Sequence, residues 1–356
     1  MSENKAKKKH PIRTYVARFF IVFFTTLLMI VIALYLLMLV IAKGPSETVK
    51  KRFVCSVTET SALKFLANWY YSDEKIAEYI GQGINNATDE KTDVSLVQIS
   101  SNITTDSLNP QGNDPASADD PQTELPQTPL ELLDISGSTY KGKMMLIHDP
   151  SRVFVGISGS YGANYEGRTV MDMMNSYGAI GATNAGGFED NGGVGNGGIP
   201  NGLVISEGQL RYGNLGWSYN VIGFDNNNIF HCGKMTGQQA LDLGIRDAVC
   251  WGPMLIVNGK PQNIEKPLEG GLNPRTAIGQ TSDGTVILVV IDGRQASSLG
   301  ATYDDLVTIM QQHGAVNAAN LDGGSSSHMI FNGEIITTCS SLYGPRKMPT
   351  CILIKP

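Results

Sequence analysis

The longest apolar run of the chain covers residues 19–42, which are 24 consecutive residues without a charge. As an α-helix with a rise of roughly 1.5 Å per residue, this run would be about 36 Å long, enough to cross a bilayer with some tilt. A secretory signal peptide has a shorter apolar core and then a small-residue cleavage site, and Ala42-Lys43-Gly44-Pro45 is a poor site of that kind. The pattern therefore predicts an uncleaved transmembrane anchor.

The tail before the anchor, residues 1–18, is basic. Its charged residues are Glu3 and the cations Lys5, Lys7, Lys8, Lys9, Arg13 and Arg18. By the positive-inside rule such a tail stays in the cytoplasm, which predicts an extracytoplasmic location for everything after residue 42. Because Lys43 and the basic residues at 50–52 reduce the charge bias, the orientation also depends on the size of the following domain.

Two stretches with weaker patterns follow the anchor. Residues 43–84 show partial i, i+3, i+4 apolar spacing, for example at Phe65, Leu66 and Trp69, and this predicts a helical stalk near the membrane. Residues 85–139 are rich in Asn, Asp, Ser, Thr, Gln and Pro and have little to bury, which predicts a polar linker.

From residue 140 to residue 356, apolar runs of strand length alternate with helical patterns and glycine-rich turns. The runs predict strands at residues 143–147, 153–157, 179–183, 203–206, 248–250, 254–257, 285–291 and 315–321. Apolar residues at helical spacing that end at a glycine predict helices at residues 170–177, 238–243 and 303–312, the last with Thr302 as N-cap. The expected fold is α/β or α+β, a mixed β-sheet domain with packed helices.

Three of these strands end in a polar residue followed by glycine. They end at Asp322 before Gly323, at Asp292 before Gly293, and at Asn184 shortly before Gly186. Glycine lets a ligand approach the backbone closely, so the repetition predicts one shared site at these strand ends. Taken singly, each motif is also typical of an ordinary turn.

Composition narrows the class of protein. With 42% hydrophobic and 17% charged residues, the chain can bury a sizeable core. Beyond the tail, 21 basic and 32 acidic residues remain, a net charge of −11 that argues against nucleic acid as a partner.

The number of cysteines is odd, so the five cannot all pair with one another. The sequence leaves two interpretations open: a disulfide bridge Cys339–Cys351 or Cys232–Cys250, or scattered buried thiols.

Five short motifs follow one another within residues 140–354. They are Asn184-Ala185-Gly186-Gly187-Phe188, Gly252-Pro253-Met254-Leu255, Arg275-Thr276-Ala277-Ile278-Gly279, Val290-Ile291-Asp292-Gly293-Arg294 and Leu321-Asp322-Gly323-Gly324-Ser325-Ser326. In this order and spacing they resemble the phosphodiester glycosidases, a family whose animal member removes N-acetylglucosamine from a phosphodiester. Ala185 and Ser325 stand where that family usually has glycine, and Pro345-Arg346 stands in place of its late Glu-Arg pair.

The resemblance implies cleavage of a sugar-1-phosphodiester at the anomeric carbon. Such a reaction needs a carboxylate as nucleophile or base and cations that hold the phosphate. The candidates for the carboxylate are Asp322, Asp292 and Glu189. The candidates for substrate binding are Asn184, Gly186, Gly187, Arg275, Thr276, Arg294, Gly323, Gly324, Ser325 and Ser326. An alternative makes Arg275 a structural ion-pair partner of Asp292.

Two further kinds of side-chain chemistry are open near these motifs. His328 follows the serine tract, and we interpret it as a polar residue at a strand start rather than a catalytic base. The clustered carboxylate, amide and carbonyl oxygens would also suit Ca²⁺, although no EF-hand spacing is present; no other cofactor is expected.

Together these features predict a membrane-anchored, extracytoplasmic hydrolase of a bacterial cell, acting on sugar phosphodiesters in cell-surface or exported polysaccharide. Its expected partners are this carbohydrate and the membrane. One alternative is a glycan-binding or exopolysaccharide assembly protein that has no turnover. Another is a glycosyl transferase on the same fold, which would pass the sugar to an acceptor other than water.

Overall fold

The structure is a computed structural model that describes residues 12–60, 63–80, 90–99, 129–190, 194–263, 268, 270–341 and 344–356. The chain separates into two compact units, Met1–Phe53 and Val54–Pro356. Much of the predicted cytoplasmic tail, residues 1–11, lies outside the described residues, as does most of the predicted linker, residues 100–128.

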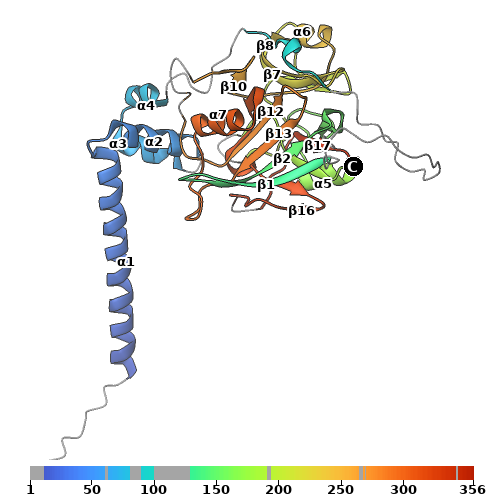
Figure 1. Cartoon of the computed structure of the whole chain (residues 1–356). Coiled ribbons are helices and arrows are strands. Elements are labelled where there is room, and N and C mark those ends of the chain that lie inside the picture. Colours follow the sequence, from blue (N-terminus) through green and yellow to red (C-terminus); the bar gives the residue numbers. More distant parts are fainter. Residues whose placement is uncertain are drawn as a thin grey trace, which may run out of the picture. The chain divides into compact units, whose positions relative to one another are not determined.

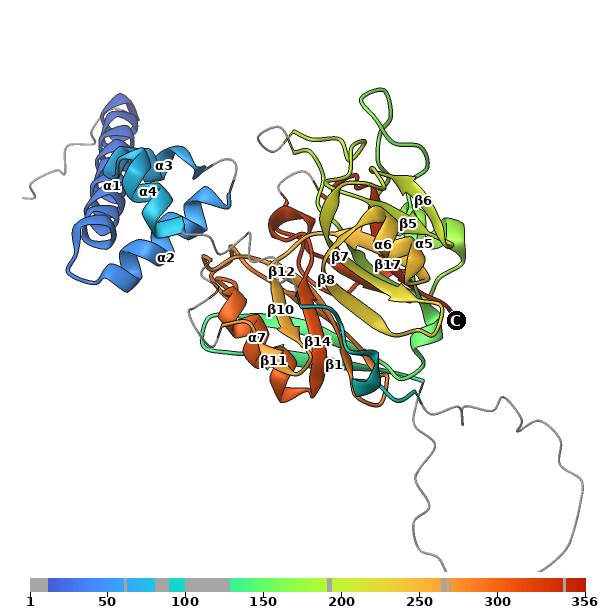
Figure 2. The ribbon, with the colours of Figure 1, turned by 90° about the horizontal axis from the view of Figure 1, so that it is seen from above.

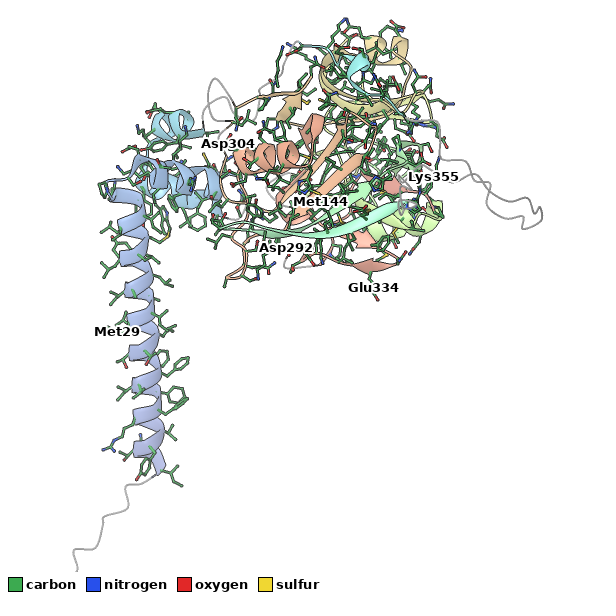
Figure 3. All side chains as sticks on the ribbon, viewed as in Figure 1. Met29, Met144, Asp292, Asp304, Glu334 and Lys355 are labelled. Atoms are coloured by element: carbon green, nitrogen blue, oxygen red, sulfur yellow. The ribbon has the colours of Figure 1, made fainter. Side chains whose placement is uncertain are left out.

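The first unit consists mainly of the helix α1 (Ile12–Lys43), 32 residues long. Its most apolar window has a mean hydropathy of 2.8 and buries nothing within the structure; side chains such as Met29 point outward from the helix (Figure 3). The hydroxyl of Thr25 donates to the carbonyl of Ile21, which satisfies a polar group on this apolar helix. The predicted helix is confirmed, and its length and composition are those that membrane anchors and signal sequences share.

The second unit is built around a seven-stranded antiparallel sheet (Figure 1). Its strands in spatial order are β1 (Leu130–Ser136), β2 (Lys141–Ile147), β13 (Val286–Ile291), β12 (Arg275–Thr281), β14 (Ala315–Asn320), β10 (Met254–Val257) and β11 (Lys260–Pro261). Because β13 and β14 both pair antiparallel with β12, they run parallel to each other and end at the same edge of the sheet. The predicted site motifs that follow these two strands therefore share that edge.

Two five-stranded antiparallel sheets complete the second unit. One has the order β16 (Glu334–Ile335), β15 (Met329–Phe331), β4 (Gly181–Asn184), β17 (Thr350–Ile354) and β3 (Val153–Ile157). The other has the order β6 (Gln209–Tyr212), β5 (Val204–Ser206), β9 (Ile245–Cys250), β7 (Ser218–Asp225) and β8 (Phe230–Thr236). The main apolar core joins all three sheets, with Leu288, Ile352 and Ile222 among its members. The fold is thus α+β rather than α/β.

Three helices cover the sheets, and each lies where the apolar spacing predicts it. The helix α7 (Tyr303–Gln312) packs on β14 and β10 (Figure 2). It begins with a reciprocal capping box between Thr302 and Asp305, which satisfies backbone N–H groups of its first turn. The helix α5 (Val170–Tyr177) ends at Gly178 in a left-handed conformation with φ of 64°, and α6 (Gly237–Asp242) packs on β8 and β9.

The second unit also includes chain that precedes its sheets, from Val54 onward. The short helices α3 (Phe65–Tyr70) and α4 (Asp73–Ile80) follow α2 (Glu47–Thr58). Further on, Thr92 Oγ1 accepts a hydrogen bond of 3.2 Å from the N–H of Cys232, and the N–H of Gln98 donates to the carbonyl of Ser282 at 2.7 Å. Residues 90–99, the described start of the predicted linker, are therefore hydrogen-bonded along the domain.

Candidate active site

The ends of β14 and β4 are joined directly by hydrogen bonds. The backbone N–H of Asp322 donates to the carbonyl of Ala185 at 2.9 Å, and the side-chain amide of Asn184 donates to the carbonyl of Asp322 at 2.6 Å. These bonds bring two of the three predicted strand ends, from two different sheets, into one site.

A buried polar network lies beneath this junction. The carbonyl oxygen of the Asn184 side chain accepts a bond of 2.8 Å from the hydroxyl of Thr276, and that hydroxyl lies 3.1 Å from the Ser327 hydroxyl. Asn184 and Thr276 have no exposed surface. Because they are enclosed by protein, their geometry indicates that they hold the site loop in place rather than touch a substrate.

Asp322 carries the most perturbed carboxyl of the site. Burial raises its pKa to about 6, although hydrogen bonds from the Ser326 hydroxyl and the Gly323 N–H and the nearby charge of Arg346 act in the opposite direction. A carboxyl that titrates near pH 6 can exchange protons under ordinary cellular conditions, which suits a nucleophile or an acid–base group.

Arg346 is the cation whose charge acts on this carboxyl, and it was not among the predicted site residues. It forms an ion pair with Asp190, and its Nη1 lies 3.5 Å from the Ser325 hydroxyl. Its guanidinium carbon lies 4.8 Å from the centre of the Phe188 ring. In the sequence, its position in place of the family's late Glu-Arg pair is the feature that points to Arg346. The predicted carboxylate Glu189, next to Asp190, is exposed.

The third strand end, at Asp292, follows β13 and lies on the same edge of the seven-stranded sheet as the end of β14. Its carboxylate accepts hydrogen bonds from the N–H of Thr338 at 2.8 Å and from the Thr338 hydroxyl at 3.2 Å. Two positions on, Arg294 has a φ of 60°, an uncommon conformation for a residue with a side chain. A β-carbon added to Gly324 would lie 3.1 Å from Arg294 Nη2, so this guanidinium lies beside the site loop.

Arg275 has partners other than those expected. It is 3% exposed, and its Nη2 pairs with the carboxylate of Glu59 at 2.8 Å and not with Asp292. Its guanidinium carbon lies 3.9 Å from the centre of the Tyr303 ring. Successive residues of a strand face opposite sides of the sheet, so that with Thr276 facing the site, Arg275 faces α7. The contacts therefore support a structural ion pair rather than a phosphate ligand.

The glycines of the Asn184 motif make room for an aromatic side chain. A β-carbon at Gly187 would come closer than any contact distance to the ring of Trp251, while Gly186 packs against Val249 and donates its N–H to the Thr350 hydroxyl at 3.3 Å. Both glycines are buried. They shape the site wall through their lack of a side chain, which agrees with the close approach that the sequence predicted.

His328 has the environment of a structural residue. It is fully buried, its Nδ1 lies 2.8 Å from the carbonyl of Ser326, and burial lowers the pKa of the imidazole. Its Nε2 has no hydrogen-bond partner among the described residues. Burial therefore favours the neutral form of this ring, which lies just before β15.

The cysteines and the acidic side chains bear on the predicted disulfide bridges and metal site. None of the five cysteines forms a disulfide bond in the structure; four are buried, and Cys339 is partly exposed. Within the described parts of the chain, no three His, Cys, Asp or Glu side chains gather in a way that could hold a metal ion. Binding of Ca²⁺ stays a prediction.

Comparison with solved structures supports the fold. The catalytic domain of zebrafish N-acetylglucosamine-1-phosphodiester alpha-N-acetylglucosaminidase, auto-inhibited by its pro-peptide, aligns with a TM-score of 0.56. The match covers 65% of this chain and 85% of that domain at 22% sequence identity.

Sequence comparisons agree with the structural one. The uncharacterized SPbeta prophage-derived protein YomE of Bacillus subtilis is 31% identical over 194 residues, which are 51% of this chain and 29% of that protein. Mouse N-acetylglucosamine-1-phosphodiester alpha-N-acetylglucosaminidase is 26% identical over 221 residues, which are 56% of this chain and 41% of that protein. The chain thus spans less than half the length of these relatives. The family model for phosphodiester glycosidases matches residues 177–355, half of the chain and all the strand ends of the site, and the chain belongs to that family.

Proposed function

We propose that the second unit hydrolyses sugar-1-phosphodiester bonds at Asp322. The observation that supports this function most is the Asp322 carboxyl at the junction of two sheets, whose pKa burial raises to about 6 and on which the positive charge of Arg346 acts. A carboxylate beside a guanidinium provides the two groups that this chemistry needs, one for the sugar and one for the phosphate.

In the proposed reaction the bond between the anomeric carbon and the phosphate oxygen breaks, and the phosphate leaves as a monoester anion. Asp322 either takes a proton from the water that attacks this carbon, or attacks the carbon itself and is displaced by water in a second step. Arg346 and Arg294 bind the phosphate oxygens, because a guanidinium fork matches them in shape and charge. The hydroxyl of Ser325 and the N–H groups of the following turn orient the substrate.

We further propose that α1 anchors the chain in the cell membrane with its basic tail in the cytoplasm. Residues 43–84 then act as a stalk, and the second unit works outside the membrane on cell-surface or exported polysaccharide. The 24 uncharged residues of the anchor and the acidic balance beyond it support this placement. The name of the mouse relative supports N-acetylglucosamine as the first sugar to test.

The proposed function is tested with the full chain in detergent and UDP-N-acetylglucosamine in ¹⁸O-labelled water. Release of N-acetylglucosamine that carries ¹⁸O at the anomeric carbon is expected from hydrolysis. Transfer of the sugar to an added acceptor, without labelled free sugar, would indicate a glycosyl transferase instead. Binding of the nucleotide sugar without any product would indicate a glycan-binding protein.

The pH dependence of this reaction should follow Asp322. Because the carboxyl acts in its ionised form and burial raises its pKa to about 6, kcat/KM is expected to fall roughly tenfold per pH unit below that value and to level off above it. The measurement is initial-rate kinetics between pH 4.5 and pH 8, with intrinsic fluorescence as a check that the fold persists. A rate that decreased as the pH rose through 6 would make Asp322 a general acid and contradict the role proposed.

A further inference from the structure

The carboxylate of Glu59 is built into the loop that precedes β12. Its Oε1 accepts a hydrogen bond of 3.1 Å from the N–H of Gly271, and its Oε2 accepts bonds of 2.8 Å from the Asn273 side-chain amide and from Arg275. The Glu59 side chain is 14% exposed and that of Arg275 is 4% exposed. Three donors on one enclosed carboxylate make a specific contact rather than a surface ion pair.

The backbone beside Glu59 approaches the same loop just as closely. The hydroxyl of Ser56 accepts a bond of 2.9 Å from the N–H of Leu272, and a β-carbon at Gly271 would lie 2.2 Å from the N atom of Ser56. Only glycine fits at that position. The segment at residues 56–59 and the loop at residues 271–275 therefore form one packed unit, although they are more than 200 positions apart in the chain.

Glu59 also sets the orientation of the Asn273 side chain. An amide has a donor end and an acceptor end, and the Glu59 carboxylate only accepts hydrogen bonds, so it takes the NH₂ end. The carbonyl end of Asn273 then accepts bonds from Arg294, of 3.3 Å from Nε and 3.1 Å from Nη2. Asn273 is 2% exposed, so no solvent replaces either partner.

The far end of this relay is the site loop itself. Arg294 lies beside Gly324, and the N–H of Gly324 donates to the carbonyl of Pro274 at 2.9 Å. Gly324 follows Asp322 by two positions. These contacts connect Glu59 through Asn273 to the cation and the backbone beside Asp322.

We propose that Glu59 is a positioning residue of the active site, which holds Arg294 in place for the substrate phosphate through the Asn273 amide. The inference rests on the proposed function for the role of Arg294. By this inference, residues far upstream of the site motifs complete the site, so that a fragment starting at residue 140 lacks part of it. The full chain is accordingly the protein to test.

The test is a double-mutant cycle on the full chain in detergent. Glu59→Gln should raise KM and the dissociation constant for UDP-N-acetylglucosamine roughly ten- to a hundredfold, with a smaller change in kcat. On an Arg294→Gln background the same substitution should cause little further loss, because Glu59 acts through Arg294. Glu78→Gln, which removes an exposed carboxylate paired with Lys75 on α4, is the matched control and should leave both constants unchanged.

The outcomes separate this inference from the proposed function. If the parent protein binds or cleaves the nucleotide sugar and Glu59→Gln changes neither constant, or if the losses from Glu59→Gln and Arg294→Gln simply add, the positioning role is wrong. Higher activity in Glu59→Gln would overturn it as well, since the carboxylate would then obstruct the site. If Glu59→Gln does not fold, Glu59→Asp keeps the charge and should show a partial rise in KM. A parent protein that neither binds nor cleaves the probe would refute both proposals.

Discussion

Replacing Asp322 by asparagine is expected to lower kcat at least about a thousandfold, because asparagine has the shape of the carboxylate without its nucleophilicity or basicity. The same substitution should leave the free energy of unfolding at pH 7 unchanged or higher. Burial raises the pKa of Asp322 to about 6, so the stability this group contributes is present at low pH and is lost as the pH rises through about 6. Asparagine carries no charge at either pH and avoids that loss.

The two effects are measured on one set of proteins, as kcat with UDP-N-acetylglucosamine and as Tm at pH 5 and pH 7. The Tm of Asp322→Asn should exceed that of the parent protein by more at pH 7 than at pH 5. Asp242→Asn, which alters an exposed carboxylate on α6 bonded to Gln238, is the control for an unspecific charge change. A comparable loss of kcat in Asp292→Asn, whose carboxylate already accepts two hydrogen bonds from Thr338, would show that Asp322 is not the principal carboxylate.

The sequence predicted the strand ends of the site well because their signals are local. An apolar run that stops at Asp322 or Asn184 before glycine determines both the buried strand and the place where a polar side chain appears. The three helices could be predicted equally well, since the cap at Thr302 and the left-handed Gly178, which mark helix ends, depend on only a few neighbouring residues.

Several strands escaped prediction because their buried residues are polar. In β12, Arg275, Thr276 and Gln280 are all enclosed, each with partners from other elements, so the strand does not read as an apolar run. In β7 and β8, Asp225 and His231 are buried together, with a distance of 3.0 Å between Oδ2 and Nε2. Polar residues of this kind are stabilised by tertiary contacts, which no local pattern contains.

The partners of Arg275 and Arg346 could not be predicted from the sequence for the same reason. Arg275 suits a phosphate by its chemistry, and only the fold shows that Glu59 already satisfies it. That partner lies in a stretch whose apolar spacing predicts a stalk, more than 200 positions upstream. Arg346 stands in no apolar pattern that would place it in the structure. Its ion pair with Asp190 forms in the segment that leads into β17, and this depends on the tertiary fold.

Arg346→Gln is expected to lower kcat/KM roughly a hundredfold, mainly through a higher KM, because the phosphate loses its charged fork and Asp190 loses its partner. The substitution should also move the pH profile. The positive charge of Arg346 lowers the pKa of Asp322 against the effect of burial, so without that charge the pKa lies further above its ordinary value. The acidic limb of kcat/KM should consequently shift to higher pH.

Arg346→Lys separates the effect of the positive charge from the effect of the planar guanidinium fork. Lysine keeps the charge, so the acidic limb should stay close to the parental position, while the loss of the planar fork should still raise KM. The matched control is Lys347→Gln, which removes the adjacent cation, exposed and paired with Glu166 on another loop. If Arg346→Gln changed KM without moving the pH limb, the titrating carboxyl would be a group other than Asp322. If it moved the limb without changing KM, Arg346 would tune Asp322 electrostatically and the phosphate would be held by Arg294.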